Sequence, residues 1–64
     1  MDIKAEIDSI KHHVDKGNYH AAINLSISAM NACRRIHHQD GVDIFLDLIK
    51  DIVQTMTDEF GSQG

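Results

Sequence analysis

The sequence has no proline, one cysteine and no long uninterrupted apolar run among its 64 residues. A single cysteine excludes an internal disulfide, and a thiol outside any disulfide favours a reducing cytoplasm over an export route. Charged residues break the N-terminal segment at short intervals: Asp2, Lys4, Glu6, Asp8 and Lys11. That segment therefore lacks the apolar region of a signal peptide, and no other segment approaches membrane-spanning length. We expect a cytoplasmic protein that does not contact a membrane.

The chain is also short. It has room for one domain, which we place at residues 1–60, followed by a flexible tail at 61–64. A chain of this length buries only roughly 60% of its unfolded surface, so a lone monomer is marginally stable. With no disulfide to add stability, association with another chain is the expected source of further burial.

Basic residues are scarce in the last part of the chain. Residues 39–64 hold one lysine against six acidic residues, a balance of -5, whereas residues 1–38 come to +1 with histidines neutral. An acidic helix face repels a phosphate backbone and suits a basic protein partner. The alternative is a solvated face that serves solubility alone, since charged helix faces usually meet water.

The four glycines are the expected breaks: Gly17, Gly41, Gly61 and Gly64. They predict three helices: one between a cap at Asp2 and a close at Lys16 and Gly17, one at about 19–36, and one from Gly41 or Val42 to Phe60. Asp2 is positioned to cap the first helix, and Gly17 in a left-handed conformation would end it. Short connections make successive helices antiparallel neighbours, so the predicted fold is all-α, with three helices running up-down-up.

The start of the third helix carries its own signal. Asp40 is followed three residues later by Asp43, which resembles a capping box with aspartate in place of glutamate. On this interpretation residues 37–41 form the second break.

The apolar arcs of the three helices do not match. The first has one narrow seam, at Ile3, Ile7, Ile10 and Val14. With about 100° per residue, the apolar positions of the second sweep roughly 240° and those of the third roughly 160°, with Ile49 and Ile52 at the centre of the third face. The first and third helices cannot cover the second, which predicts a homodimer. The alternative is that alanines of the second helix face water, which alanine tolerates.

One stretch resembles the turn and second helix of a tetratricopeptide repeat, through Gly17, Tyr19, Ala22, Ile23, Ala29 and Met30. The resemblance implies a helical hairpin with Tyr19 wedged between the first two helices, and it suggests peptide binding. The first helix departs from the repeat pattern and no second repeat follows, which excludes a superhelical groove.

The chain as a whole resembles the small accessory proteins encoded in the early regions of lambdoid temperate phages. It shares their shortness, acidity, helical character and lack of targeting signals. The resemblance implies binding to host or phage regulatory proteins, often as a dimer.

Metal and catalytic chemistry have little support. Cys33 and His37 are four residues apart, so a helix through both would place them on one face as a pair of ligands. No third ligand converges on them within one protomer; the alternative is a site across a dimer interface, where His12 or His13 could come close. No serine, threonine or cysteine has the context of a nucleophile. We expect no bound metal, no cofactor and no catalysis.

The candidate partner-binding residues are the charged side chains late in the chain and one leucine among them: Arg34, Arg35, Asp43, Asp47, Leu48 and Asp51. The leading hypothesis is a protein-protein interaction module with a regulatory role. The alternative is a nucleic-acid-associated regulator that uses Arg34, Arg35, Lys11 and Lys16. The exposed aspartates of the third helix make direct nucleic-acid binding the weaker hypothesis, and cations at a helix end also complement the helix dipole.

Overall fold

The first helix begins at a side-chain cap. In the computed structural model, which describes residues 2–61, α1 spans Ile3–Asp15. The carboxylate of Asp2 accepts a 3.1 Å hydrogen bond from the N–H of Ala5. This bond satisfies one of the N–H groups that the start of a helix leaves without a partner. The predicted cap at Asp2 is confirmed.

The turn after α1 is closed by Gly17, which has a φ of 78°. Its N–H donates to the carbonyl of Val14 at 2.9 Å, and the N–H of Asn18 donates to the carbonyl of His13 at 2.8 Å. This pair of bonds is a Schellman motif, in which a left-handed residue reverses the chain at a helix end. The left-handed glycine predicted here is confirmed.

The second helix ends in the same motif with a histidine in the glycine position. α2 spans Tyr19–Arg35, and His37 follows it with a φ of 58°. The N–H of His37 donates to the carbonyl of Arg34 at 3.1 Å, and that of His38 donates to the carbonyl of Cys33 at 2.8 Å. The predicted break at 37–41 contains this turn, but left-handed backbone is uncommon for a residue that has a Cβ atom, so the sequence does not single out His37 as the turn residue.

The third helix starts earlier than predicted. α3 spans Gln39–Phe60, whereas Gly41 or Val42 was the expected first residue. His38 caps it, since its Nδ1 atom accepts a 2.9 Å hydrogen bond from the N–H of Gly41. Because His37 makes the turn, Gly41 is free to lie inside the helix, where it is buried.

The predicted capping box of Asp40 and Asp43 is wrong for the same reason. Both residues lie within the first turns of α3, after its cap at His38. The carboxylate of Asp43 instead accepts a 3.0 Å hydrogen bond from the side-chain amide of Gln39. Asp40 places its negative charge in the first turn, where it complements the positive end of the helix dipole.

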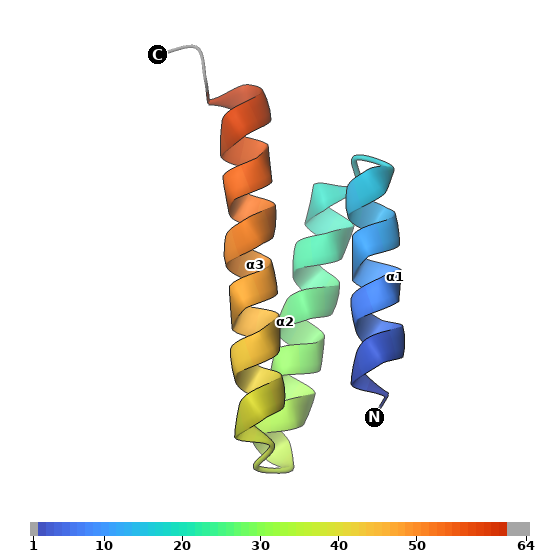
Figure 1. Cartoon of the computed structure of the whole chain (residues 1–64), viewed down its shortest axis with the longest axis vertical. Helices are drawn as coiled ribbons and strands as arrows, with labels where there is room; N and C mark the ends of the chain where they lie inside the picture. Colours follow the sequence, from blue (N-terminus) through green and yellow to red (C-terminus); the bar gives the residue numbers. More distant parts are fainter. Residues whose placement is uncertain (1, 62–64) are drawn as a thin grey trace.

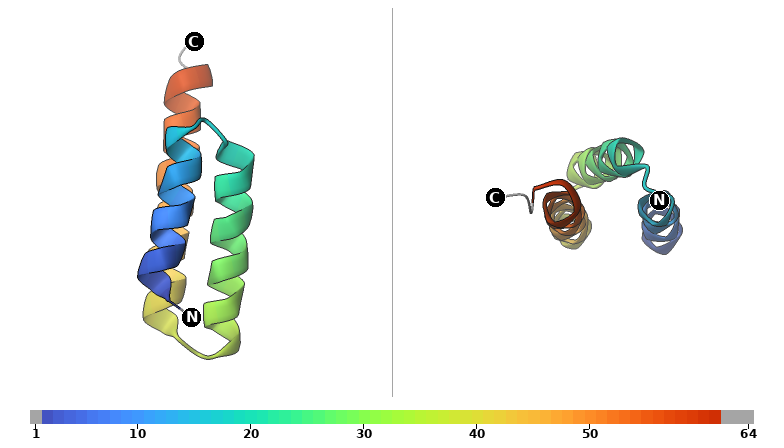
Figure 2. Two further views of the ribbon diagram at one scale, coloured as in Figure 1. Left: turned by 90° about the vertical axis from the view of Figure 1, so that its right-hand side faces the viewer. Right: turned by 90° about the horizontal axis from the view of Figure 1, so that it is seen from above.

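The three helices run up-down-up, as the sequence predicts (Figure 1). Seen along the helices, α2 lies at the corner between α1 and α3 (Figure 2). α2 packs along both of the other helices, while α1 and α3 meet at very few positions. The wide apolar surface of α2 is therefore used from two sides, as predicted for a central helix.

The core lies where the three helices face one another. Small residues of α2 recur at four- and three-residue spacing and are all buried: Ala22, Ser26, Ala29 and Cys33. They allow the neighbouring backbones to approach, and Ile10 of α1 with Phe45 and Ile52 of α3 fills the space against them. Ile49, predicted at the centre of the α3 face, is only half-buried. Phe45 takes the central place and is fully buried.

Tyr19 lies between α2 and the end of α3. Its ring meets the Phe60 ring edge-on, with 6.2 Å between centroids, and its hydroxyl donates a 2.7 Å hydrogen bond to Glu59. The prediction that Tyr19 wedges between the first two helices is wrong. α2 and α3 are antiparallel, and α3 extends past the first turn of α2 (Figure 1), so the Tyr19 side chain reaches along α3 to its last turn.

The C-terminal end of α3 is closed by Gly61, whose N–H donates to the carbonyl of Thr57 at 2.6 Å. The flexible tail predicted at 61–64 lies outside the described residues except for Gly61.

Candidate functional site

A groove runs between α1 and α3, on the side where these two helices do not meet. Two adjoining pockets, of about 240 and 200 Å³, share Lys11, Leu48 and Asp51 and so form one continuous hollow. We call it the α1–α3 groove. Its lining comes from both helices: Ile7, Lys11, Val14 and Asp15 of α1, and Ile44, Asp47, Leu48, Asp51, Ile52 and Thr55 of α3.

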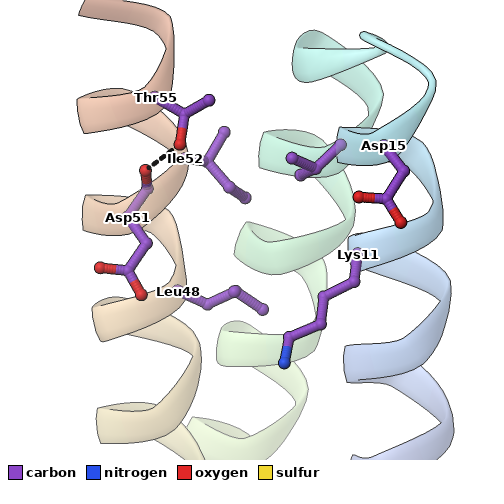
Figure 3. A pocket seen from close by; sticks show the side chains of 7 residues that line it. Lys11, Asp15, Leu48, Asp51, Ile52 and Thr55 are labelled. Atoms are coloured by element: carbon purple, nitrogen blue, oxygen red, sulfur yellow. Dashed lines mark hydrogen bonds between the residues drawn. The ribbon is translucent and has the colours of Figure 1, made fainter. Parts of the chain in front are cut away.

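The floor of the α1–α3 groove is apolar. Leu48 and Ile52 point from α3 into the gap (Figure 3). Ile52 is 2% exposed and belongs to the core, whereas Leu48 is half-buried and reaches the groove surface. Ile7 and Val14 supply the matching apolar surface from α1. The floor of the groove is therefore a strip of aliphatic side chains between two parallel helices.

The edges of the α1–α3 groove are charged. Lys11 extends from α1 across the gap towards α3 (Figure 3), and three carboxylates surround the hollow, from Asp15, Asp47 and Asp51. Among residues 2–61, Lys4 and Asp8 form the one ion pair, at 3.1 Å. None of the four charged groups of the groove is therefore paired. One cation against three anions leaves the groove with a balance of -2.

The predicted partner-binding residues divide among three places: the α1–α3 groove, the part of α3 outside it, and the end of α2. Asp47, Leu48 and Asp51 are brought together in the α1–α3 groove. Asp43 lies on the same helix but lines neither pocket. The sequence reasoning missed the α1 contribution. Ile7, Lys11 and Val14 recur at spacings of four and three, which places them on one face of a helix and is the signal that was available.

Arg34 and Arg35 are not part of the groove. Both are exposed in the last turn of α2, and neither forms an ion pair with another described residue. Two cations at a helix C-terminus interact favourably with the negative end of the helix dipole. They do not continue into a positive surface along α3, where Asp43, Asp47 and Asp51 are exposed.

A second surface is apolar and uncharged. Leu46, Val53 and Phe60 recur every seven residues on α3 and are 41%, 46% and 67% exposed. Half-buried residues fill the three- and four-residue steps between them, at Ile49 and Met56. Side chains at such spacings line one face of a helix.

The neighbouring helix extends this surface. Ile23 of α2 lines a pocket of about 400 Å³ together with Val53, Met56 and Phe60, and Ile27 follows one turn further along α2 with 40% of its surface exposed. We call the combined surface the α2–α3 apolar face; its members are Ile23, Ile27, Leu46, Ile49, Val53, Met56 and Phe60. None of them is charged.

The pair of metal ligands considered at Cys33 and His37 does not form on a helix face. α2 ends at Arg35, and the left-handed backbone of His37 carries its side chain away from the helical position four residues after Cys33. Among residues 2–61, no three histidine, cysteine or acidic side chains lie close enough together to hold a metal ion. In the same part of the chain, no helix has the length and apolarity that crossing a bilayer requires.

Comparison of the chain with protein families, with curated proteins and with solved structures finds no match in any of the three.

Proposed function

We propose that this protein is a non-enzymatic helical interaction module that acts as a homodimer in the cytoplasm. The observation that carries the proposal is the α2–α3 apolar face. Its exposed members on α3, Leu46, Val53 and Phe60, stand in register at seven-residue intervals. Isolated apolar side chains are common on protein surfaces, whereas a contiguous row of them marks an interaction site.

The spacing of the row indicates what it packs against. Steps of three and four residues from Leu46 to Phe60 are the pattern by which one helix lies along another. In a twofold dimer the same surface is presented by both copies, so the interface must be complementary to itself. An apolar surface meets this condition, because none of its members carries a charge that would face its own copy.

Burial of this face in a dimer would contribute a free energy comparable to the stability of a small domain. Burial of a leucine, valine or phenylalanine side chain contributes about 1.5 to 3 kcal/mol. Leu46, Val53 and Phe60 on each of two copies would therefore add burial that a 64-residue monomer lacks.

The role of such a module is to bind another protein. The resemblance to early-region accessory proteins of lambdoid temperate phages favours a regulatory protein as the target. Phosphate-backbone binding through Arg34 and Arg35 has less support, since the exposed aspartates of α3 would face the nucleic acid beside them.

The test is sedimentation velocity on the wild type and on two matched variants. Leu46→Glu should give a monomer, because it buries a charge in the proposed interface. Ile44→Glu should remain a dimer, because Ile44 is 40% exposed, much like Leu46, but lies in the α1–α3 groove. The thermal midpoint of the wild type should rise with protein concentration. A wild type that stays monomeric into the millimolar range would contradict the proposal.

A further inference from the structure

The α1–α3 groove lies where the fourth helix of a four-helix bundle would pack. α1 and α3 run parallel to each other, and both pack on α2, which is antiparallel to them (Figures 1 and 2). A fourth helix laid in the groove, antiparallel to both, would complete an up-down-up-down bundle. From Ile44 to Thr55, α3 advances about 16 Å at about 1.5 Å per residue, which is room for about three helical turns.

We propose that this groove binds an amphipathic helix of another protein whose apolar stripe is flanked by lysine and arginine. This inference names the partner chemistry of the interaction module proposed above, and it rests on that function. The apolar stripe would cover Leu48 and Val14, and the basic flank would lie along Asp47 and Asp51. These two carboxylates are one turn apart, exposed, and free of any ion pair among the described residues.

The charges select this occupant over a second copy of the chain. If the groove met itself across a twofold axis, two Lys11 side chains would face six carboxylates, a balance of -4 in one interface. Like charges brought together in an interface suppress that pairing. A basic helix reverses the sign of the interaction, and the uncharged α2–α3 apolar face remains available for self-association at the same time.

Lys11 places a second requirement on the charges of the partner helix. It lines both pockets, and its side chain extends from α1 towards α3 (Figure 3), so an occupying helix must pass its ammonium group. A partner with one carboxylate facing α1 would pair with Lys11, while a helix that is basic on both flanks would be repelled there. The best partner therefore has lysine or arginine on the α3 side and one acidic residue on the α1 side.

The experiment uses synthetic helical peptides of about 18 residues, long enough for a helix to form readily on binding. One carries leucine at three- and four-residue spacing with lysine on both flanks, and its counterpart carries glutamate on both flanks. Fluorescence anisotropy should show the lysine peptide binding the full chain roughly ten- to hundredfold more tightly than the glutamate peptide, with the difference shrinking as salt is added. Lys11→Ala should tighten binding of the lysine peptide.

The matched variants separate local from overall charge. Asp47→Lys with Asp51→Lys should abolish the preference for the lysine peptide. Asp43→Lys with Asp58→Lys changes the net charge equally on the same helix, but neither residue lines the groove, so the preference should remain. All four residues are exposed, so both double variants should fold. Equal effects of the two double variants would overturn the proposal.

Two further measurements distinguish this proposal from the one it rests on. Amide chemical-shift changes on adding the lysine peptide should cluster at Ile7, Lys11 and Leu48. Changes centred on Val53 and Phe60 would overturn the groove assignment while leaving the interaction module standing. Sedimentation of the same samples reports self-association separately, so a dimer that binds neither peptide would overturn the groove proposal alone.

Discussion

Gly41 of α3 lies against Cys33 of α2, so that a Cβ atom on Gly41 would stand 2.5 Å from the Cys33 sulfur. Cys33 is fully buried and belongs to the core, so a shift of its sulfur would disturb the packing around it. The two helices approach closely here because one of them has no side chain at the contact. Gly41 is therefore a packing residue, although the sequence suggests a helix break.

Gly41→Ala should destabilise the fold. Overpacking of a core typically destabilises a protein by about 1 to 3 kcal/mol, while alanine in place of glycine within a helix stabilises it by about 1 kcal/mol. We expect a net loss of up to about 2 kcal/mol from these two terms, measured by urea denaturation. In the Cys33→Ala background the same substitution should cost less, because the sulfur is gone. An equal cost in both backgrounds would show that the two residues are not coupled.

His37→Gly should stabilise the protein. His37 holds a φ of 58°, which costs a residue with a Cβ atom about 1 to 2 kcal/mol and costs glycine almost nothing. We expect a gain of about 1 kcal/mol. The reciprocal control is Gly17→Ala, where a Cβ atom meets nothing within 4 Å, so only backbone strain is added. That variant should lose about as much as the first one gains, and a stability loss for His37→Gly would refute the assignment.

Ile52→Ala and Ile49→Ala should differ, although the sequence places both at the centre of one face. Ile52 is 2% exposed, so its truncation should cost about 2 to 5 kcal/mol at any protein concentration. Ile49 is half-buried and lies in the α2–α3 apolar face, so we expect about 1 to 2 kcal/mol in dilute solution. Its loss should also weaken self-association. Thermal melts over a range of concentrations would separate the two effects.

Tyr19 should titrate at higher pH than an ordinary tyrosine. Its hydrogen bond to the Glu59 carboxylate raises the pKa of the phenol, and partial burial and the negative charge of Glu59 act in the same direction. Because the folded pKa is raised, the stability from this contact is fully present below about pH 10 and is lost as the pH rises through the raised pKa.

Tyr19 is the only tyrosine, so ultraviolet titration reports it alone. Glu59→Gln removes the carboxylate charge while keeping an acceptor, and it should bring the pKa of Tyr19 back towards its ordinary value. Identical titration curves for the wild type and this variant would mean that the hydrogen bond between the two residues is absent in solution.

The sequence predicts the helices well and the turn before α3 poorly. Apolar periodicity and the signals at Asp2 and Gly17 locate α1 and α2, because each signal acts within a few residues. The second turn uses His37, whose side-chain type occupies left-handed backbone far less often than glycine does, while the buried Gly41 resembles a break in the sequence. The difference between a turn glycine and a packing glycine depends on the neighbouring helix, which a local pattern does not contain.

The sequence points to residues on the α3 side of the groove only. Asp47, Leu48 and Asp51 are candidate partner-binding residues from the sequence, and they line one surface in the structure, although their binding of a partner stays a prediction. Lys11 completes that surface from α1, and its presence there depends on how far apart α1 and α3 stand. That separation is set by the packing of each helix on α2, which periodicity within one helix does not report.

The near absence of contact between α1 and α3 also bears on how the chain finds its fold. The packing joins α1 to α2 and α2 to α3, pairs that follow one another directly in the sequence. The chain therefore closes only short loops, and the entropy lost before helices meet is small. Helical domains with such local topology fold within microseconds to milliseconds. Each copy should thus complete its own hairpins faster than two dilute copies can meet, so any dimer would assemble from protomers that are already folded.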